Sequence, residues 1–332
     1  MSNIRIIEGT YKIRGKDVDL AGMVFPLTEE FKVGAKGGYV TVDGKAVAGF
    51  PDRNIKISVP GPNAYESAGK AQIEQREESD EEVIDRLRDR FDMLEDMTRA
   101  CKKGDVKAMI VSGPPGVGKS FGVEKVLGKH DTIAALSDRP AKYQVVKGAM
   151  SAIGLYCKLF NYADKDNVLV FDDCDSIFAD ELSLNILKAA LDSKKTRTIH
   201  WNTDSFKLRN EGVPDSFEFK GSAIFITNLK FDKAKGKIRE HLMALESRCH
   251  YIDLTIDTDR EKMLRIKQIT RDGMLNEHKF ADELVQEIID FVDINKNRLR
   301  ELSLRTVLKV ADLAVAFPTK WEAMAENTVM KR

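Results

Sequence analysis

The sequence predicts an α/β protein with a five-stranded parallel sheet, and two observations lead to this fold class. The first is a series of short apolar runs separated by helix-compatible segments: AMIVSG (108–113), KYQVVKG (142–148), NVLVFDD (167–173), SAIFITN (222–228) and CHYIDL (249–254). Near-continuous apolar strands that alternate with helices are typical of a parallel sheet covered on both faces. The second is a glycine-rich loop that joins the first run to FGVEKVLGK, a segment compatible with a helix.

The residues before these runs predict a small β-rich domain. YVTVDGKAVAG is typical of a hairpin, because Asp43 and Gly44 both tolerate the positive φ of a two-residue turn. NIKISVPGP alternates like a strand and ends at Pro60. The polar stretch that follows ends in the charge run EQREESDEE, and we interpret it as a linker.

Helical spacing occurs on both sides of the predicted sheet. One helical face before it consists of Ile84, Leu87, Phe91 and Leu94, and one after it of Leu304, Leu308, Ala311 and Val315. The chain is therefore predicted to contain a β-rich N-terminal domain (1–62), a linker (63–82), an α/β domain (83–255) and a helical domain (256–332).

Composition excludes several classes of protein. The 53 basic and 53 acidic residues balance, so no global charge points to nucleic acid or to a membrane surface. The four cysteines are dispersed and form no metal-ligand spacing with the histidines, which argues against a zinc site or a disulfide framework. No apolar run is long enough for a signal peptide or a membrane span. We expect a cytoplasmic protein without a membrane partner.

The glycine-rich loop carries the most specific signal. Residues 113–120 read GPPGVGKS and match G-x-x-x-x-G-K-[ST] between a strand and a helix, the context that a phosphate loop requires. The backbone N–H groups and the helix N-terminus would surround the phosphates of a nucleotide. Lys119 would contact the β- and γ-phosphates, and Ser120 would ligate Mg²⁺. The predicted nucleotide-binding residues are Gly113, Pro114, Pro115, Gly116, Val117, Gly118, Lys119 and Ser120.

Three carboxylates close the third apolar run, in VLVFDDCD (168–175). Alone, this stretch is compatible with a metal site, an acid/base pair or a polar strand end. Beside a phosphate loop, Asp172 is predicted to hold Mg²⁺ and Asp173 to orient the attacking water. Cys174 is predicted to be a packing residue, and Asp175 an N-cap of the following helix.

Taken in order, these motifs resemble those of the AAA+ ATPases over residues 80 to 320. GPPGVGKS resembles the Walker A loop, VLVFDD the Walker B strand, and AIFITN the sensor 1 strand, with Asn228 at its tip. The resemblance implies a P-loop AAA+ core with a C-terminal helical lid, and ATP hydrolysis with Mg²⁺. FDDCD and SFEFKGSAIFITNLKF also resemble ATPases of tailed bacteriophages, which would place the protein in the host cytoplasm.

Two arginines are assigned by the same resemblance. HLMALESRCHYIDL is similar to the arginine-finger segment, which points to Arg248, with Arg239 as the alternative. In the family this arginine reaches the γ-phosphate of a neighbouring subunit, which implies a homo-oligomeric ring. ELSLRTVLKVADLA is similar to a sensor 2 helix, with Arg305 preferred over Arg298 and Arg300. The family usually has glutamate where this chain has Asp173, and the shorter side chain puts fast hydrolysis in question.

The target is less defined by the sequence. KGAMSAIGLYCKLF lacks the aromatic–hydrophobic–glycine triplet of protein-threading members, and Tyr156 and Phe160 are predicted to be core residues. Segment 194–220 predicts a hairpin of TRTIHW against SFKLRN, with Trp201 and several basic residues on or near it: Lys194, Lys195, Arg197, Lys207 and Arg209. This hairpin is either a nucleic-acid contact or a solvated hairpin with Trp201 packed against the sheet.

Three functions follow from these readings. The first is an ATPase that remodels a nucleic-acid or nucleoprotein target in phage DNA metabolism. The second is an ATP-dependent scaffold or loader with slow hydrolysis, or a protein-remodelling ATPase. The third, a P-loop kinase or GTPase, is disfavoured because TNLKFD and INKNR both fail the NKxD guanine motif.

Overall fold

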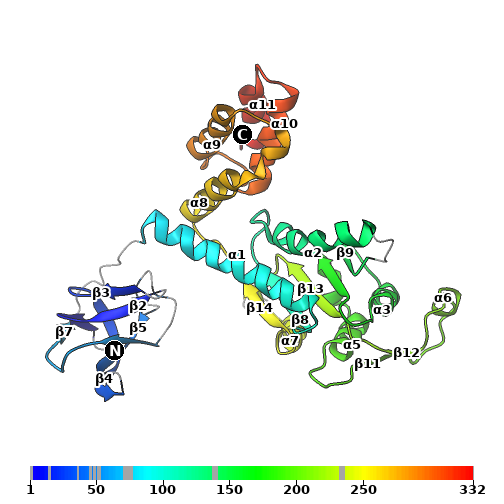
Figure 1. Ribbon diagram of the computed structural model, residues 1–332, viewed down its shortest axis with the longest axis horizontal. Coiled ribbons are helices and arrows are strands. Elements are labelled where there is room, and N and C mark those ends of the chain that lie inside the picture. The colour runs from blue at the N-terminus through cyan, green and yellow to red at the C-terminus, as the bar shows by residue number, and fades with distance from the viewer. Residues whose placement is uncertain are drawn as a thin grey trace. The chain divides into compact units, whose positions relative to one another are not determined.

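The chain divides into two compact units, Met1–Val83 and Ile84–Arg332. The computed structural model describes residues 3–13, 16–35, 37–44, 47, 50, 54–69, 78–136, 141–231 and 236–331 (Figure 1).

The N-terminal unit is a seven-stranded antiparallel sheet with the strand order β3-β2-β6-β5-β4-β1-β7. Its strands are β1 (Asn3–Ile6), β2 (Thr10–Ile13), β3 (Lys16–Asp19), β4 (Val24–Gly34), β5 (Gly37–Asp43), β6 (Asn54–Ser58) and β7 (Tyr65–Gly69). In β6 the buried Ile55 and Ile57 alternate with exposed residues, which is the pattern of a strand with one face toward a core.

Two features of this unit differ from the sequence prediction. Strand β7 falls within the predicted linker and pairs with β1; its polar sequence, YESAG, gives no apolar strand signal. Strand β5 pairs with β4 and β6. Residues 45, 46, 48 and 49 of the predicted hairpin, and residues 70–77 of the predicted linker, lie outside the described residues.

The second unit contains the predicted five-stranded parallel sheet, which is therefore confirmed. Its order is β14-β8-β13-β10-β9, and every ladder is parallel. The strands are β8 (Ala108–Ser112), β9 (Tyr143–Lys147), β10 (Val168–Asp172), β13 (Ser222–Thr227) and β14 (His250–Asp253). Strands β8, β10 and β13 are buried throughout, as expected when helices cover both faces of a sheet.

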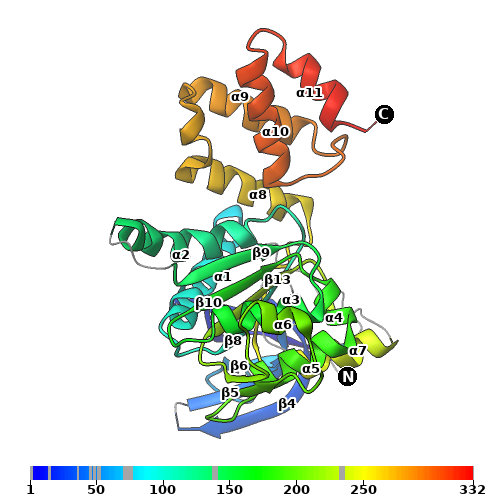
Figure 2. The same cartoon turned by 90° about the vertical axis from the view of Figure 1, so that its right-hand side faces the viewer.

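Helices cover this sheet on both sides (Figures 1 and 2). On one face, alternate strand residues such as Ile110, Phe171 and Phe225 join a core with α3 (Ala152–Asn161), α5 (Glu181–Ala190) and α7 (Gly236–Glu246). Two further helices, α1 (Asp80–Lys102) and α2 (Lys119–Leu136), pack on each other where Leu94 lies against Gly122.

The helical end of the chain forms its own core after β14. It contains α8 (Asp259–Ile269), a π-helix (Thr270–Met274), a 3-10 helix (Asn276–His278), α9 (Asp282–Ile294), α10 (Leu304–Ala316) and α11 (Trp321–Val329). Helix α8 starts at a capping box in which Thr258 and Glu261 satisfy each other's backbone N–H groups. Among the described residues, no helix is both long and apolar enough to cross a membrane.

A short excursion lies between α5 and β13, and its predicted pairing is wrong. Strand β11 (Thr198–His200) pairs with β12 (Ser216–Glu218), not with SFKLRN. Residues 206–210 form α6 instead, because the Ser205 side chain accepts a hydrogen bond from the Leu208 backbone and caps a helix. Helix α6 lies at the far end of this excursion (Figure 1).

Candidate nucleotide site

The predicted site residues meet at the carboxyl edge of the parallel sheet. The phosphate loop follows β8, Asp172 ends β10, and Asn228 directly follows β13. Because β13 pairs with both β8 and β10, the side chain of Asn228 starts between the other two. Crevices at this edge of α/β sheets are where ligands bind.

Lys119 is the first residue of α2 and is only 6% exposed. Its ammonium group donates to the carbonyl oxygens of Gly113 (2.7 Å) and Pro114 (2.9 Å) and to Oδ1 of Asn228 (2.7 Å). Burial lowers the pKa of Lys119 to about 8, although the nearby Asp173 and Asp172 counteract this. The amine is thus held inside the loop by three oxygen atoms.

Ser120 and Asp172 form the second contact across this edge. The Ser120 hydroxyl donates to Oδ1 of Asp172 at 3.0 Å. Asp172 is 5% exposed, and its other carboxylate oxygen lies 3.2 Å from Nζ of Lys147 in β9. A buried carboxylate of this kind is stable because it is paired on both oxygens.

Asp173 adopts a backbone conformation that is uncommon for a residue with a side chain, with φ at 54°. Its backbone N–H donates to the Ile226 carbonyl (3.0 Å), and its carboxylate accepts a hydrogen bond from Nδ2 of Asn228 (2.9 Å). Asn228 therefore joins Lys119 to Asp173 through its two amide atoms. The sequence suggested the three residues separately but contained no signal for this bridge.

Of the two predictions for the residues after Asp173, the structure agrees with one and contradicts the other. Cys174 is buried in the core, as predicted. Asp175 precedes α4 (Ser176–Ala179) but has helical φ and ψ and caps nothing, so the N-cap prediction is wrong. Its carboxylate accepts a hydrogen bond from the Thr227 hydroxyl at 2.7 Å instead, and burial raises its pKa. The capping residue is Asp180, which starts α5.

The phosphate loop contacts the helical segment through backbone contacts that the sequence did not indicate. Gly116 and Gly118 have φ of 70° and 100°, conformations that favour glycine. The Gly116 carbonyl accepts a hydrogen bond from the Leu304 backbone N–H at 3.0 Å. A Cβ added to Gly116 would lie 2.6 Å from Cβ of Ser303, so no larger residue fits there without a shift.

Of the three sensor 2 candidates, Arg305 directly follows Leu304, which contacts this loop. It is the second residue of α10, and its charge contributes to lowering the pKa of Lys119, after the larger effect of burial. Arg300 is directed elsewhere, since its Nε donates to the Met330 carbonyl at 2.9 Å. The backbone of Arg298 likewise accepts from Lys331 at the end of the chain.

Arg248 lies away from the other predicted site residues. It comes two residues before β14, at the amino edge of the parallel sheet, whereas the phosphate loop follows the carboxyl end of β8. The side chain is exposed and donates to the Ala244 carbonyl (2.6 Å) and the Ser247 hydroxyl (3.3 Å). The alternative residue, Arg239, is also exposed on α7.

The excursion after α5 buries two residues that the nucleic-acid reading would expose. Trp201 is 9% exposed and packs on Tyr156, as the alternative reading predicts. Arg197 is 5% exposed and donates to the carbonyls of Ala190 and Gly221. Tyr156 is fully buried and Phe160 packs on the same core, which agrees with their predicted role.

No known family model matches the chain. The chain is 34% identical over 336 residues to a protein of Enterobacteria phage T4, described as an uncharacterized 36.7 kDa protein in the nrdC-mobD intergenic region. The alignment covers 98% of this chain and 97% of the phage protein.

The chain belongs to the family of this phage T4 protein. The course of the chain agrees with the predicted AAA+ resemblance, since β13, which precedes Asn228, lies between β8 and β10 and the helical segment follows β14.

Solved structures with a similar course of the chain include the following three. Domain III of the Thermotoga maritima replication initiation protein DnaA has a TM-score of 0.42 and 8% identity, over 73% of this chain and 91% of that one. The Aeropyrum pernix ORC2 protein in its ADP form has a TM-score of 0.40 and 13% identity, over 75% of this chain and 68% of that one. Drosophila ORC bound to DNA has a TM-score of 0.37 and 14% identity, over 79% of this chain and 70% of that one.

Proposed function

We propose that the protein binds ATP and Mg²⁺ at the carboxyl edge of its parallel sheet and hydrolyses the nucleotide. The observation that carries this proposal is the bonded series Lys119–Asn228–Asp173 beside the Ser120–Asp172 pair. A lysine, a hydroxyl, a carboxylate for the metal and a second carboxylate for water are the parts that P-loop phosphoryl transfer requires.

The phosphate loop fits a nucleotide in its chemistry. The positive φ of Gly116 and Gly118 turns the backbone tightly around the start of α2. The Lys119 ammonium group is held at present by carbonyl and amide oxygens, weaker partners than phosphate oxygens. Nucleotide binding would exchange these partners, and the phosphate charges would raise the lowered pKa of the lysine.

The donor set also fits Mg²⁺. The Ser120 hydroxyl and the Asp172 carboxylate are hard oxygen ligands, and they already lie within hydrogen-bond distance of each other. Mg²⁺ bound to nucleotide needs only one or two protein ligands and supplies neutralisation of the charge that develops on the phosphates. Lys147 would keep the remaining Asp172 oxygen paired.

Asp173 is the proposed residue that orients the attacking water and accepts its proton. Asn228 fixes its carboxylate from one side, and the backbone bond to Ile226 fixes its main chain. The alternative is a nucleotide-dependent scaffold or loader, in which the shorter Asp173 supports only slow hydrolysis. Single-turnover hydrolysis decides between them: tight binding with negligible turnover would favour the scaffold.

Arg248 is proposed to act on the site of a neighbouring subunit in a homo-oligomer. Its position at the opposite edge of the sheet supports action in trans, because its own phosphate loop follows the far end of the adjacent strand. An arginine supplied in this way is worth about 10³–10⁵ in rate. Within one chain, we propose that Arg305 at the start of α10 contacts the phosphates.

The proposed target is a nucleic acid or nucleoprotein, with a protein target as the alternative. Because Arg197 and Trp201 are buried, they do not support a nucleic-acid target. The residues that support it lie at the end of the excursion. There Phe206 is 72% exposed at the start of α6, next to Lys207. Exposed aromatic and basic residues suit stacking on single-stranded bases.

Steady-state ATPase assays with and without single- and double-stranded DNA test this target. We expect stimulation by DNA that salt weakens, and loss of stimulation in Phe206→Ala with the basal rate kept. Unchanged rates with DNA, together with no salt-sensitive binding, would leave the ATPase proposal intact and contradict the DNA target.

The division of labour that we propose follows the predicted domains. Residues 83–255 form the nucleotide-binding domain and residues 256–332 act as its lid. The β-rich domain 1–62, followed by the segment 63–82, is the proposed partner-binding part.

A further inference from the structure

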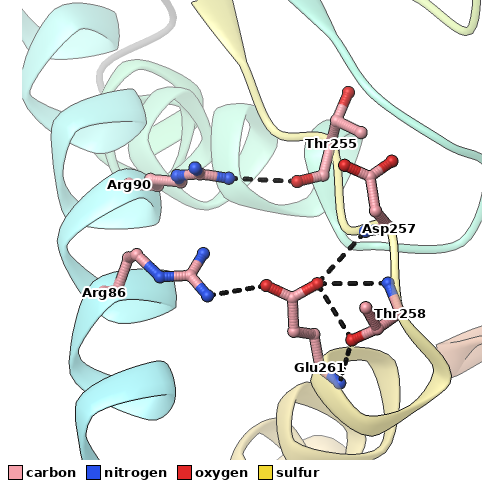
Figure 3. Close-up of polar contacts among 6 residues, drawn as sticks. All are labelled: Arg86, Arg90, Thr255, Asp257, Thr258 and Glu261. Atoms are coloured by element: carbon pink, nitrogen blue, oxygen red, sulfur yellow. Dashed lines mark hydrogen bonds and ion pairs between the residues drawn. The ribbon is translucent and has the colours of Figure 1, made fainter. Parts of the chain in front are cut away.

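Helix α1 contacts the connection that joins β14 to α8, and Figure 3 shows these contacts. Nη2 of Arg86 lies 2.6 Å from Oε1 of Glu261, and Nη1 of Arg90 donates to the Thr255 carbonyl at 3.0 Å. The Arg86–Glu261 pair is largely buried, with side-chain exposures of 25% and 16%. Two arginines one helical turn apart thus hold the start of the helical segment.

Glu261 links this ion pair to the beginning of α8. One carboxylate oxygen takes the Arg86 contact, and the other accepts hydrogen bonds from the backbone of Thr258 and Asp257 (Figure 3). Burial alone would raise the pKa of Glu261, but the bonds from Arg86 and Thr258 lower it below its ordinary value. The carboxylate therefore stays charged and keeps both sets of contacts at neutral pH.

Arg265 makes a third contact one turn further along α8. Its guanidinium carbon lies 3.6 Å from the ring centroid of Phe91 in α1. Arg265 is 6% exposed, Nη1 donates to Gln268, and Nε has no hydrogen-bond partner among the described residues. Burial lowers the pKa of Arg265 to about 10, so the side chain is still a cation at neutral pH. Burying this cation costs more free energy than burying an apolar residue at the same position would.

Helix α1 reaches the phosphate loop directly, and α8 is connected to it through α10. Gly118 of the loop has Phe91 of α1 on one side and Leu304 of α10 on another, since an added Cβ would lie 3.9 Å and 3.5 Å from their atoms. Helix α10 shares one buried core with α8 through residues such as Ile266 and Val307. The position of α8 therefore sets the position of α10, which carries Arg305.

We propose that Arg86, Arg90 and Arg265 are positioning residues that hold the helical segment closed on the phosphate loop. They fix α8 against α1, and α8 in turn keeps the N-terminus of α10 on Gly116 and Arg305 beside Lys119. This inference rests on the proposed ATPase function for its kinetic consequence, but its structural consequence is independent of any activity.

The structural consequence is measured by the distance between two spin labels on the full-length chain. Suitable sites are Leu182→Cys in α5 and Ile294→Cys in α9, which are 51% and 81% exposed, whereas three native cysteines are buried. We expect one narrow distance distribution in the otherwise native chain and a clearly broader one in Arg86→Ala. Arg88→Ala is the matched control, because Arg88 is exposed on the same helix and pairs only with Asp85 among the described residues. An unchanged distribution in Arg86→Ala would overturn the proposal.

The kinetic consequence separates positioning from simple loss of structure. In Arg86→Ala we expect kcat for ATP to fall at least tenfold while the Kd for a fluorescent ADP analogue changes less than threefold, because Lys119 and the loop are untouched. Arg86→Lys should recover most of the rate, since it keeps the charge near Glu261, and Arg88→Ala should match the native chain. Equal losses in Arg86→Ala and Arg88→Ala would contradict the proposal. If the native chain hydrolyses no ATP, the proposed function fails and the label distances still decide this inference.

Discussion

The two edges of the parallel sheet differ in how their polar residues are satisfied. At the carboxyl edge, Lys119 and Asp172 are buried and bonded to residues from other strands. At the amino edge, Arg248 is exposed, and its side-chain hydrogen bonds in the described structure go to Ala244 and Ser247, its own neighbours in the chain. Burying charges is costly unless they are paired, so the carboxyl edge is a built site within one chain. The proposed role of Arg248 requires a neighbouring subunit to supply its partner.

The largest loss of ATP hydrolysis is expected from a substitution at the amino edge of the sheet, where Arg248 is exposed. Arg248→Ala should lower kcat for ATP by about 10³–10⁵ through loss of charge stabilisation in the transition state. The Kd for ATP and the unfolding midpoint should stay nearly the same, because the side-chain hydrogen bonds of Arg248 go to residues within four positions of it in the described structure. Rates are compared by single-turnover hydrolysis, with Arg239→Ala as the control. A larger loss in the control would move the role to Arg239.

A somewhat smaller loss is expected for Asp173→Asn. The change keeps the size of the side chain and removes its ability to accept a proton, so kcat should fall by about 10²–10⁴ with ATP binding retained. Asp173→Glu is the informative partner variant, because it restores the side-chain length usual in the AAA+ family. Faster hydrolysis in Asp173→Glu would show that the native chain is tuned for slow turnover. A normal rate in Asp173→Asn would remove Asp173 from the mechanism.

Lys119→Ala tests the buried edge through binding. Loss of a charged donor to the phosphates should weaken ATP binding by about 10- to 100-fold. The change also leaves Asn228 and two loop carbonyls without their present donor. Isothermal titration with ATP and Mg²⁺ measures this effect, and Lys125→Ala on the exposed side of α2 is the control. Equal affinity in Lys119→Ala and the native chain would place the nucleotide elsewhere.

The smallest effect is a pH dependence of ATP affinity. The pKa of Lys119 is lowered to about 8 without nucleotide, and phosphates would raise it by favouring the charged amine. Above about pH 8, binding would then take up a proton, and affinity should fall by up to about tenfold per pH unit. Lys119→Arg should flatten this dependence, because arginine stays charged in that range. An equally steep decline in Lys119→Arg would assign the proton to another group.

The sequence predicted the parallel sheet and indicated which polar residues lie at its carboxyl edge, because both depend on local patterns. The five apolar runs marked the five strands, of which β8, β10 and β13 are buried throughout. The phosphate loop has a fixed spacing from Gly113 to Ser120. Strand β7 was missed because its pairing with β1 does not depend on an apolar sequence. The SFKLRN segment was assigned to a strand on a weak alternation, but it forms a helix because the Ser205 side chain caps it.

Contacts between distant segments could not be predicted from one sequence. The Arg86–Glu261 pair joins residues 175 positions apart, and nothing in either local pattern indicates the other. Asp175 illustrates the same limit for a contact across 52 positions. It stands at the right place for a helix cap, but the Thr227 hydroxyl from the neighbouring strand takes its carboxylate.

The most direct test of the central claim is a mixing experiment with two inactive variants. Lys119→Ala keeps a native Arg248, and Arg248→Ala keeps a native phosphate loop, so only a mixed interface contains both. We predict that ATP hydrolysis returns when the two are combined at a concentration where they assemble, and that dilution abolishes it. If co-purification of tagged chains shows mixed assemblies and the mixture is as inactive as its components, Arg248 does not complete the site of a neighbour.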